Sequence, residues 1–278
     1  MANFMHFPTE REKVLTSGNT TIGIIPEICL VTQFQVGDWR VLYRPDETGN
    51  VRRWGLPLMI PNFSRLKDGI FQEKHTTLPM HGFGRMLPWT LTEEDGTRLS
   101  MQLRSSDATR ASYPYDFMFT ATIEVGEGTL TYMVTMENRS DEVMPIAPGF
   151  HPYFAVTQED KSRIVADGPP GFHCSDYDWV QNIPDRAYPF PQRVTVDIPR
   201  GGTLIIEEIP TSDGYALASM QVWSDLPERP DHDFVCFEPT VSSEDALNRP
   251  NDRLNIAPRS SRQFVLRLAA QPTPTETK

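Results

Sequence analysis

Apolar and polar residues alternate along the middle of the chain at a period of two. One alternating run covers residues 117–125 and a second covers residues 130–136, with Gly126-Glu127-Gly128 between them. A period of two places every second side chain on the same face of an extended strand, and a short glycine-rich turn lets two such strands pair. The sequence therefore predicts a β-hairpin here, with one buried face and one wetter face.

Similar short runs recur along the chain, and no long segment shows helical spacing. They cover residues 28–36, 39–43, 99–103, 194–198, 204–207, 217–223 and 264–268. The chain has 25 prolines among 278 residues, and they cluster between these runs, as expected for strands joined by ordered loops. These recurring runs predict an all-β fold. Because no repeat or linker is evident, we predict one large two-sheet sandwich over residues 1–270. A disordered tail rich in Pro and Thr is expected over residues 271–278.

The longest segment without alternation covers residues 168–192 and is rich in both proline and aromatic residues. Long loops in compact domains are often functional. Loops also protect the exposed edges of sheets. The sequence leaves both interpretations of this segment open.

Charge and cysteine content restrict the partners and the compartment. A formal net charge of −11 disfavours binding to nucleic acid or to an anionic membrane surface. The three cysteines form no CxxC pair, so neither a disulfide framework nor a zinc ribbon is indicated. The N-terminal segment lacks the apolar stretch of a secretory signal, and no segment is long enough to span a bilayer. We therefore expect a cytoplasmic protein without nucleic-acid or membrane partners.

Three distant segments combine histidine or glutamate with aromatic residues. They are residues 80–89 (MHGFGRMLPW), 149–154 (GFHPYF) and 233–239 (DFVCFEP), and they contain His81, His151 and Glu238. Opening a cyclic hemiacetal requires a base for the anomeric hydroxyl and an acid for the ring oxygen. Glutamate and histidine supply these roles near neutral pH without a metal or a nucleophile. We therefore predict His81, His151 and Glu238 as the catalytic residues of a sugar mutarotase.

Structural explanations compete with this hypothesis. A histidine beside aromatic residues is more often a hydrogen-bonded structural group than a catalyst, and Glu238 could end a strand paired with an arginine. However, Glu238 directly follows an apolar stretch, so it is expected to be buried, and burial raises a carboxyl pKa toward a value suited to base catalysis. These points favour a functional role.

The sequence gives little support for a metal site or a serine-hydrolase site. Two histidines and a carboxylate can hold iron or manganese, but the closely spaced H-x-H pair of familiar β-barrel metal sites is missing. The G-x-S-x-G elbow of serine hydrolases is missing too. We therefore expect no metal and no other cofactor.

At these three segments the chain resembles the aldose 1-epimerase family, and within it the hexose-6-phosphate mutarotase branch. His81-Gly82-Phe83-Gly84-Arg85, followed by Pro88-Trp89, resembles the H-G-F-A-R...P-W signature of that branch, with glycine at position 84 where alanine is usual. The other two segments resemble the H-P-Y-F and F-V-C-x-E-P motifs of the family. The resemblance covers most of the chain.

This resemblance implies a β-supersandwich in which Glu238 is the base, His151 the acid and His81 a second substrate-binding or protonating histidine. It also implies that Arg53 and Arg85 hold a phosphate group, for which arginine is well suited. Trp54 stands where the family usually has glycine, which predicts an altered pocket corner and leaves phosphate specificity open.

Further substrate contacts are less defined. Arg65, with Lys67 nearby, offers another positive cluster, and an aromatic face such as that of Trp223 could stack on a pyranose. Asp178, or Asp176 in the same loop, is a candidate for the substrate-binding aspartate of the family. The expected partner is thus a small sugar, an aldohexose or a hexose 6-phosphate.

Two other functions remain as alternatives to the mutarotase. A non-catalytic carbohydrate-binding β-sandwich would keep the aromatic and arginine contacts but would not need an acid and a base. A glycoside hydrolase usually has an Asp/Glu pair, and only Glu238 lies in a motif here. The oligomeric state is not predicted.

Overall fold

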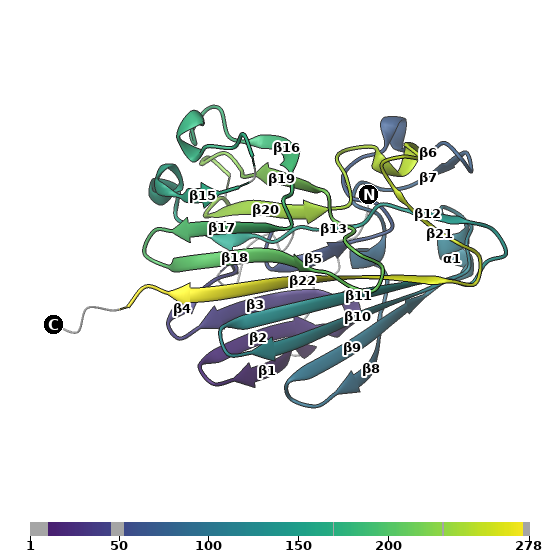
Figure 1. Cartoon of the computed structure of the whole chain (residues 1–278), viewed down its shortest axis with the longest axis horizontal. Helices are drawn as coiled ribbons and strands as arrows, with labels where there is room; N and C mark the ends of the chain where they lie inside the picture. The colour runs from purple at the N-terminus through teal and green to yellow at the C-terminus, as the bar shows by residue number, and fades with distance from the viewer. Residues whose placement is uncertain (1–10, 46–52, 169, 230, 275–278) are drawn as a thin grey trace.

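Two large antiparallel sheets contain most strands of the computed structural model, which describes residues 11–45, 53–168, 170–229 and 231–274 (Figure 1). The first sheet has the spatial order β1 (Lys13–Ser17), β2 (Thr20–Ile25), β3 (Leu30–Val36), β5 (Leu56–Met59), β13 (Gly149–Phe150), β20 (Phe234–Thr240), β19 (Ser219–Trp223) and β16 (Asp185–Pro189). Two short strands join it: β4 (Trp39–Arg40) pairs with β3, and β14 (Phe154–Ala155) pairs with β20.

The second sheet has the order β15 (Val165–Asp167), β17 (Arg193–Ile198), β18 (Gly202–Ile209), β22 (Ser261–Pro272), β11 (Thr129–Asn138), β10 (Phe117–Gly126), β9 (Arg98–Arg104) and β8 (Thr90–Glu94). Two small sheets pair β12 (Met144–Ile146) with β21 (Leu254–Ile256) and β6 (Ile70–Phe71) with β7 (Thr76–Thr77). The described helices are short: α1 (Asp107–Arg110) and the 3₁₀ turns η2 (Pro26–Ile28), η3 (Lys67–Gly69), η4 (Gly84–Met86), η5 (Gln158–Arg163), η6 (Cys174–Asp176) and η7 (Ala246–Asn248). Within the described ranges, no helix has the length and apolar character needed to cross a membrane.

The predicted hairpin is confirmed as β10 and β11. The two strands pair antiparallel, from Phe117 opposite Asn138 to Gly126 opposite Thr129. Every second side chain is buried, including Phe119, whose partner across the ladder is Met136. Burial on one face follows directly from the period-two pattern.

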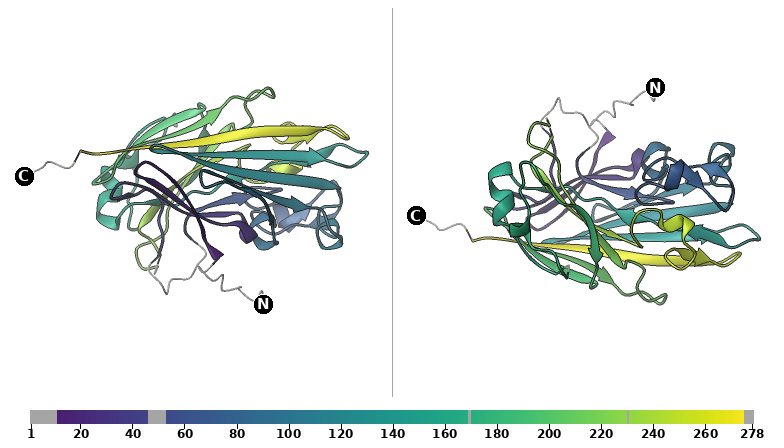
Figure 2. Two further views of the ribbon diagram at one scale, coloured as in Figure 1. Left: turned by 90° about the horizontal axis from the view of Figure 1, so that it is seen from below. Right: turned by 90° about the horizontal axis from the view of Figure 1, so that it is seen from above.

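Each of the seven further runs predicted from the sequence overlaps a strand, and the all-β sandwich is confirmed. Most buried apolar side chains of both sheets form one large cluster, the main core. The views from below and above show β1 to β3 lying against strands of the second sheet (Figure 2). The second sheet extends into the segment expected to be a disordered tail, because Gln271 and Pro272 of β22 pair with Thr203 and Gly202 of β18. Residues 275–278 of that segment lie outside the described residues.

Residues 168–192 pack against the core and also form a strand that the sequence did not predict. Phe172, Trp179 and Phe190 are buried in the main cluster. β16 is the last strand of the first sheet and pairs with β19. The segment thus extends the edge of the first sheet, in agreement with the interpretation that it protects a sheet edge. It also places Asp185 on that sheet.

Candidate active site

The two faces of β20 have different environments. Val235 and Phe237 point into the main core, whereas Phe234 and Cys236 belong to a smaller apolar cluster with Tyr153. Because side chains alternate along a strand, Glu238 shares the face of Cys236. The carboxylate therefore lies on the side of the first sheet that faces away from the main core.

Neighbouring strands add polar and aromatic groups to the same face. Gln221 of β19 lies directly opposite Glu238, and Trp223 lies opposite Cys236. One strand further, Asp185 of β16 lies opposite Trp223. Residues that oppose each other across a ladder share a face, so these side chains surround the carboxylate.

His151 reaches this face from the end of β13. Phe150 points the other way and packs edge-on against Tyr132 in the core. The His151 backbone N–H donates to the Pro57 carbonyl at 3.2 Å, which continues the pairing with β5. Its imidazole stacks on Tyr153, with ring centroids 4.7 Å apart and planes inclined by 13°. Backbone pairing and stacking together fix the orientation of the ring.

Glu238 and His151 form a buried pair. Oε1 of Glu238 lies 3.2 Å from Nδ1 of His151, and the side chains are 2% and 8% exposed. Neither atom makes a hydrogen bond with any described residue. Burial raises the pKa of Glu238 well above its usual value, and the charge of Asp185 adds to this effect. Burial, with the charges of His81 and Arg85, lowers the pKa of His151 well below its usual value.

His81 is held beside His151 by its own backbone. Its N–H donates to the Ser64 carbonyl at 2.9 Å, and its Nδ1 accepts from the Ser64 N–H at 3.1 Å. Because Nδ1 is an acceptor, the proton of the neutral ring is on Nε2. Burial, followed by the charges of Arg85 and Arg65, lowers the pKa of His81 to about 3. The His81 and His151 rings meet edge to face, 5.3 Å apart.

Two glycines allow the His81 segment to approach the sheet. Gly82 has a φ of +66°, and a Cβ there would lie 2.2 Å from the Ile60 carbonyl oxygen. A Cβ on Gly84 would lie 2.4 Å from Cγ2 of Ile60. This close approach accounts for glycine at position 84, where the family motif usually has alanine.

The charges of Arg53 and Arg85 act on His151 of the buried pair. Arg53 forms an ion pair with Asp225, which is 7% exposed, and its guanidinium lies 5.4 Å from the centre of the Trp223 ring. Arg85 is half-buried in η4. The positive charges of both arginines lower the pKa of His151. Two guanidinium groups beside a neutral histidine can bind an anionic substituent.

The other predicted contacts are less central. Arg65 is exposed, and its Nε donates to Sδ of Met80 at 3.3 Å, although its charge reaches His81. Lys67 is exposed and joins Asp245 through its backbone N–H. Trp223 lies at the site, 5.7 Å from the His151 ring in an edge-to-face contact.

The aspartates predicted in the aromatic loop are exposed. Asp178 accepts hydrogen bonds from the backbone N–H groups of Val180 and Gln181 in its own turn, and Asp176 ends η6. The structure instead places Asp185 on the face of Glu238 and pairs Asp225 with Arg53. The dense prolines around Asp185 hide the short alternation of β16, so sequence analysis missed it. Asp225 lies in a connection without periodicity.

The two remaining tryptophans of the motifs are structural. Trp54 is buried in a separate apolar cluster with Ile25, Ile28 and Leu30, and Tyr43 packs against both this cluster and the cluster of Tyr153. Trp89 is buried, and its Nε1 donates to the Gly84 carbonyl at 2.7 Å. This bond holds the segment that carries Arg85.

One group of possible metal ligands appears among the described residues. Atoms of His151, Cys236 and Glu238 lie within 4.8 Å of one another, and all three residues are buried. The metal alternative weighed from the sequence joined both histidines to the glutamate, whereas the structure places Cys236 in this group in place of His81. Two hollows of the described surface have other linings, one around Trp39, Arg44 and Arg200 and another around Arg110 and Arg259.

The two-sheet sandwich is similar to the folds of solved structures described as galactose mutarotase-like. A galactose mutarotase-related enzyme from Lactobacillus acidophilus has a similar structure, with a TM-score of 0.77 and 17% identity, covering 96% of this chain and 99% of that one. The protein Slr1438 from Synechocystis sp. PCC 6803 gives a TM-score of 0.82 with 22% identity, covering 98% of this chain and all of that one.

Sequence comparison finds a match to a family model and to curated relatives over parts of the chain. The family model for aldose 1-epimerase matches residues 65–198, which include His81 and His151 but end before Glu238. A protein of Salmonella typhimurium named "Putative glucose-6-phosphate 1-epimerase" is 33% identical over 170 residues. That match covers 55% of this chain and 53% of the relative, so it spans about half the length of either protein. These matches confirm the resemblance to the aldose 1-epimerase family that the motifs predict.

Proposed function

We propose that the protein is an isomerase that interconverts the α and β anomers of an aldohexose or its 6-phosphate. The buried pair of Glu238 and His151 carries this proposal, because a structural role does not require two titratable groups held together without a hydrogen bond. A family of epimerases and a relative named for glucose 6-phosphate support the same function.

The reaction needs one proton removed and one supplied. The anomeric hydroxyl and the ring oxygen are bonded to the same carbon, so an acid and a base a few ångströms apart can reach both. Glu238 takes the hydroxyl proton while His151 donates a proton to the ring oxygen, and the C1–O5 bond breaks to give the open-chain aldehyde. No net charge is created on the sugar.

Ring closure reverses the two roles. Rotation about C1–C2 presents the other face of the aldehyde to the hydroxyl group that closes the ring. His151 then removes the proton of that hydroxyl, and Glu238 returns a proton to the carbonyl oxygen. In the sugar-free pair, the raised pKa of the carboxyl and the lowered pKa of the imidazole place the shared proton on Glu238. Ring opening in this proposal therefore requires that proton to move to His151 when the sugar binds, which leaves Glu238 as the base and His151 as the acid.

Surrounding residues position the sugar in this proposal. His81 presents its Nε2–H to a sugar oxygen, because Nδ1 is occupied by Ser64. Trp223 offers an aromatic face for the apolar side of the pyranose. Arg53 and Arg85 bind a 6-phosphate. Arg53 retains N–H groups beyond its contact with Asp225, since guanidinium has five.

The expected setting of the activity follows from the sequence. We propose that residues 1–270 act as one domain in the cytoplasm, on a small sugar or sugar phosphate. Neither nucleic acid nor a membrane takes part in this proposal.

Anomer exchange measured by NMR tests the proposed function directly. α-Glucose, α-galactose and glucose 6-phosphate are compared with the native protein and with Glu238→Gln, which keeps the size of the side chain but removes the base. Glu207→Gln is the matched control, because Glu207 is also buried but pairs with Arg193 and Arg267 on the second sheet.

Exchange faster than the spontaneous rate, lost in Glu238→Gln and kept in Glu207→Gln, supports the mutarotase, and the fastest sugar identifies the substrate. Sugar binding without faster exchange in the native protein would instead indicate the non-catalytic carbohydrate-binding sandwich.

A further inference from the structure

Three different metal-ligating side chains meet at the proposed sugar site. Cys236 and Glu238 are two residues apart on β20 and share a face, and His151 comes from the end of the neighbouring strand β13. Their ligand atoms lie within 4.8 Å of one another. All three positions are set by strand pairing, so the cluster belongs to the rigid part of the fold.

The chemistry of the cluster matches a particular class of cation. Zn²⁺ binds thiolate, imidazole and carboxylate together, usually in a tetrahedron with bonds of about 2.0–2.3 Å. Such bonds place neighbouring ligand atoms roughly 3.5 Å apart, so small side-chain rotations bring these three into range. Hard cations such as Mg²⁺ prefer oxygen ligands and do not suit a buried thiol.

Two of the ligand atoms lack other partners. Nδ1 of His151 and Oε1 of Glu238 are both buried and make no hydrogen bond with the described residues. A buried polar atom without a partner is uncommon and calls for an explanation. A cation between these atoms and Cys236 satisfies both at once. His81 is excluded as an Nδ1 ligand, because that atom accepts from Ser64.

We propose that Zn²⁺, or another thiophilic divalent cation, binds to Cys236, His151 and Glu238 and inhibits the protein by occupying its acid and base. The cation is an inhibitor and not a cofactor, because coordination removes the lone pairs that the proton transfers need. Binding displaces the thiol proton, and any proton on Glu238, to solvent, and no group is oxidised or reduced. The inhibition rests on the proposed function, whereas the binding does not.

Cation binding can be measured without activity. The full-length protein is treated with a chelator, desalted and titrated with Cd²⁺, whose bond to sulfur gives an ultraviolet charge-transfer band, and with Zn²⁺ by calorimetry. We expect one cation per chain. Cys236→Ser should abolish the Cd²⁺ band and weaken Zn²⁺ binding by at least about 10–100-fold, which is the loss that follows removal of an outer-shell partner of a metal ligand. Cys236→Ala provides a second variant if the serine destabilises the apolar cluster.

Cys174→Ser is the matched control, because Cys174 is a buried free thiol in another part of the fold. It should keep both the band and the affinity. A Cd²⁺ band that survives in folded Cys236→Ser and Cys236→Ala, or that disappears in Cys174→Ser, overturns the proposed site, as does the absence of binding to the native protein.

Inhibition is tested separately in the anomer-exchange assay. Zn²⁺ should raise the apparent KM for the sugar, and a chelator should restore the original value. Binding at Cys236 with unchanged exchange overturns the inhibitory role. Binding by a protein that never accelerates exchange overturns the proposed function and leaves the cation site standing.

Discussion

Nδ1 of His151 lies 3.2 Å from Oε1 of Glu238, although one residue follows β13 and the other belongs to β20. The two strands are neighbours, with Gly149 opposite Thr240. A Cβ on Gly149 would lie 2.8 Å from Cβ of Thr240, so a larger residue would push the strands apart. The proposed acid and base are therefore held together by backbone pairing.

Replacing His151 with asparagine should slow anomer exchange by about 100-fold or more, the usual contribution of a positioned acid or base. The variant should still fold, because the backbone N–H that donates to Pro57 is retained. Exchange rates from NMR and a thermal melt check both points. His173→Asn is the control, since His173 is exposed in the loop that precedes β16. A His151 variant with the native rate would contradict the acid–base role.

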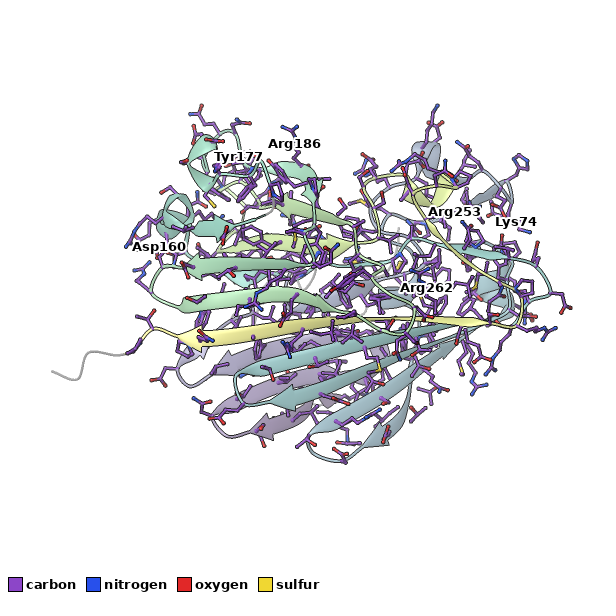
Figure 3. All side chains as sticks on the ribbon, in the orientation of Figure 1. Lys74, Asp160, Tyr177, Arg186, Arg253 and Arg262 are labelled. Atoms are coloured by element: carbon purple, nitrogen blue, oxygen red, sulfur yellow. The ribbon has the colours of Figure 1, made fainter. Side chains whose placement is uncertain are left out.

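Replacing Arg53 with glutamine should weaken the binding of glucose 6-phosphate much more than that of glucose. Hydrogen bonds to charged groups contribute about 1.5–3 kcal/mol, which corresponds to an increase in KM of roughly 10–100-fold. Steady-state exchange rates with both sugars provide the comparison. Arg186→Gln is the control, because Arg186 points outward from β16 and contacts Tyr188 (Figure 3). Equal effects on both sugars would argue against a phosphate contact.

The stability of the protein should fall as the pH is lowered, in part because of His81. Its pKa is about 3 in the folded protein against 6.5 for a free histidine, so the unfolded chain binds a proton in this window and the folded chain does not. The stability contribution is complete above pH 6.5 and is lost toward pH 3. About 3 kcal/mol is lost between roughly pH 7 and pH 4.

His81→Gln should remove this contribution, so its free energy of unfolding should fall less on acidification. Part of the pH dependence of the free energy of unfolding should remain, because the pKa of His151 is also lowered. Urea denaturation at several pH values gives the slopes. His173→Gln should keep the native slope, and a native slope in His81→Gln would show that His81 does not carry this dependence.

Replacing Gly82 with alanine should destabilise the fold by about 2 kcal/mol or more, because a positive φ is combined with a Cβ 2.2 Å from the Ile60 carbonyl oxygen. Gly96→Ala separates the two effects. Gly96 has a φ of +87° but no atom within 4 Å of its Cβ position, so about 1 kcal/mol is expected there. Chemical denaturation measures both variants, and equal losses would show that the contact with Ile60 is unimportant.

Local patterns in the sequence were sufficient to predict much of this protein. Period-two alternation determines which side chains of β10 and β11 face the core, because it places the apolar side chains on one face of each strand and burial of that face is favourable. The motifs also predict His81, His151 and Glu238 as site residues, because histidine and glutamate can supply an acid and a base near neutral pH.

Other features became visible only in the tertiary structure. The strand β16 and its Asp185 were hidden because edge strands tolerate proline, which breaks the pattern that reveals inner strands. The ion pair of Arg53 with Asp225, and the position of Cys236 beside His151, depend on contacts between distant segments. The sequence alone determined which residues face inward and which types of chemistry are available. Only the pairing of strands decided which of those residues meet, because register between distant segments is set by the packing of the whole core and not by any local pattern.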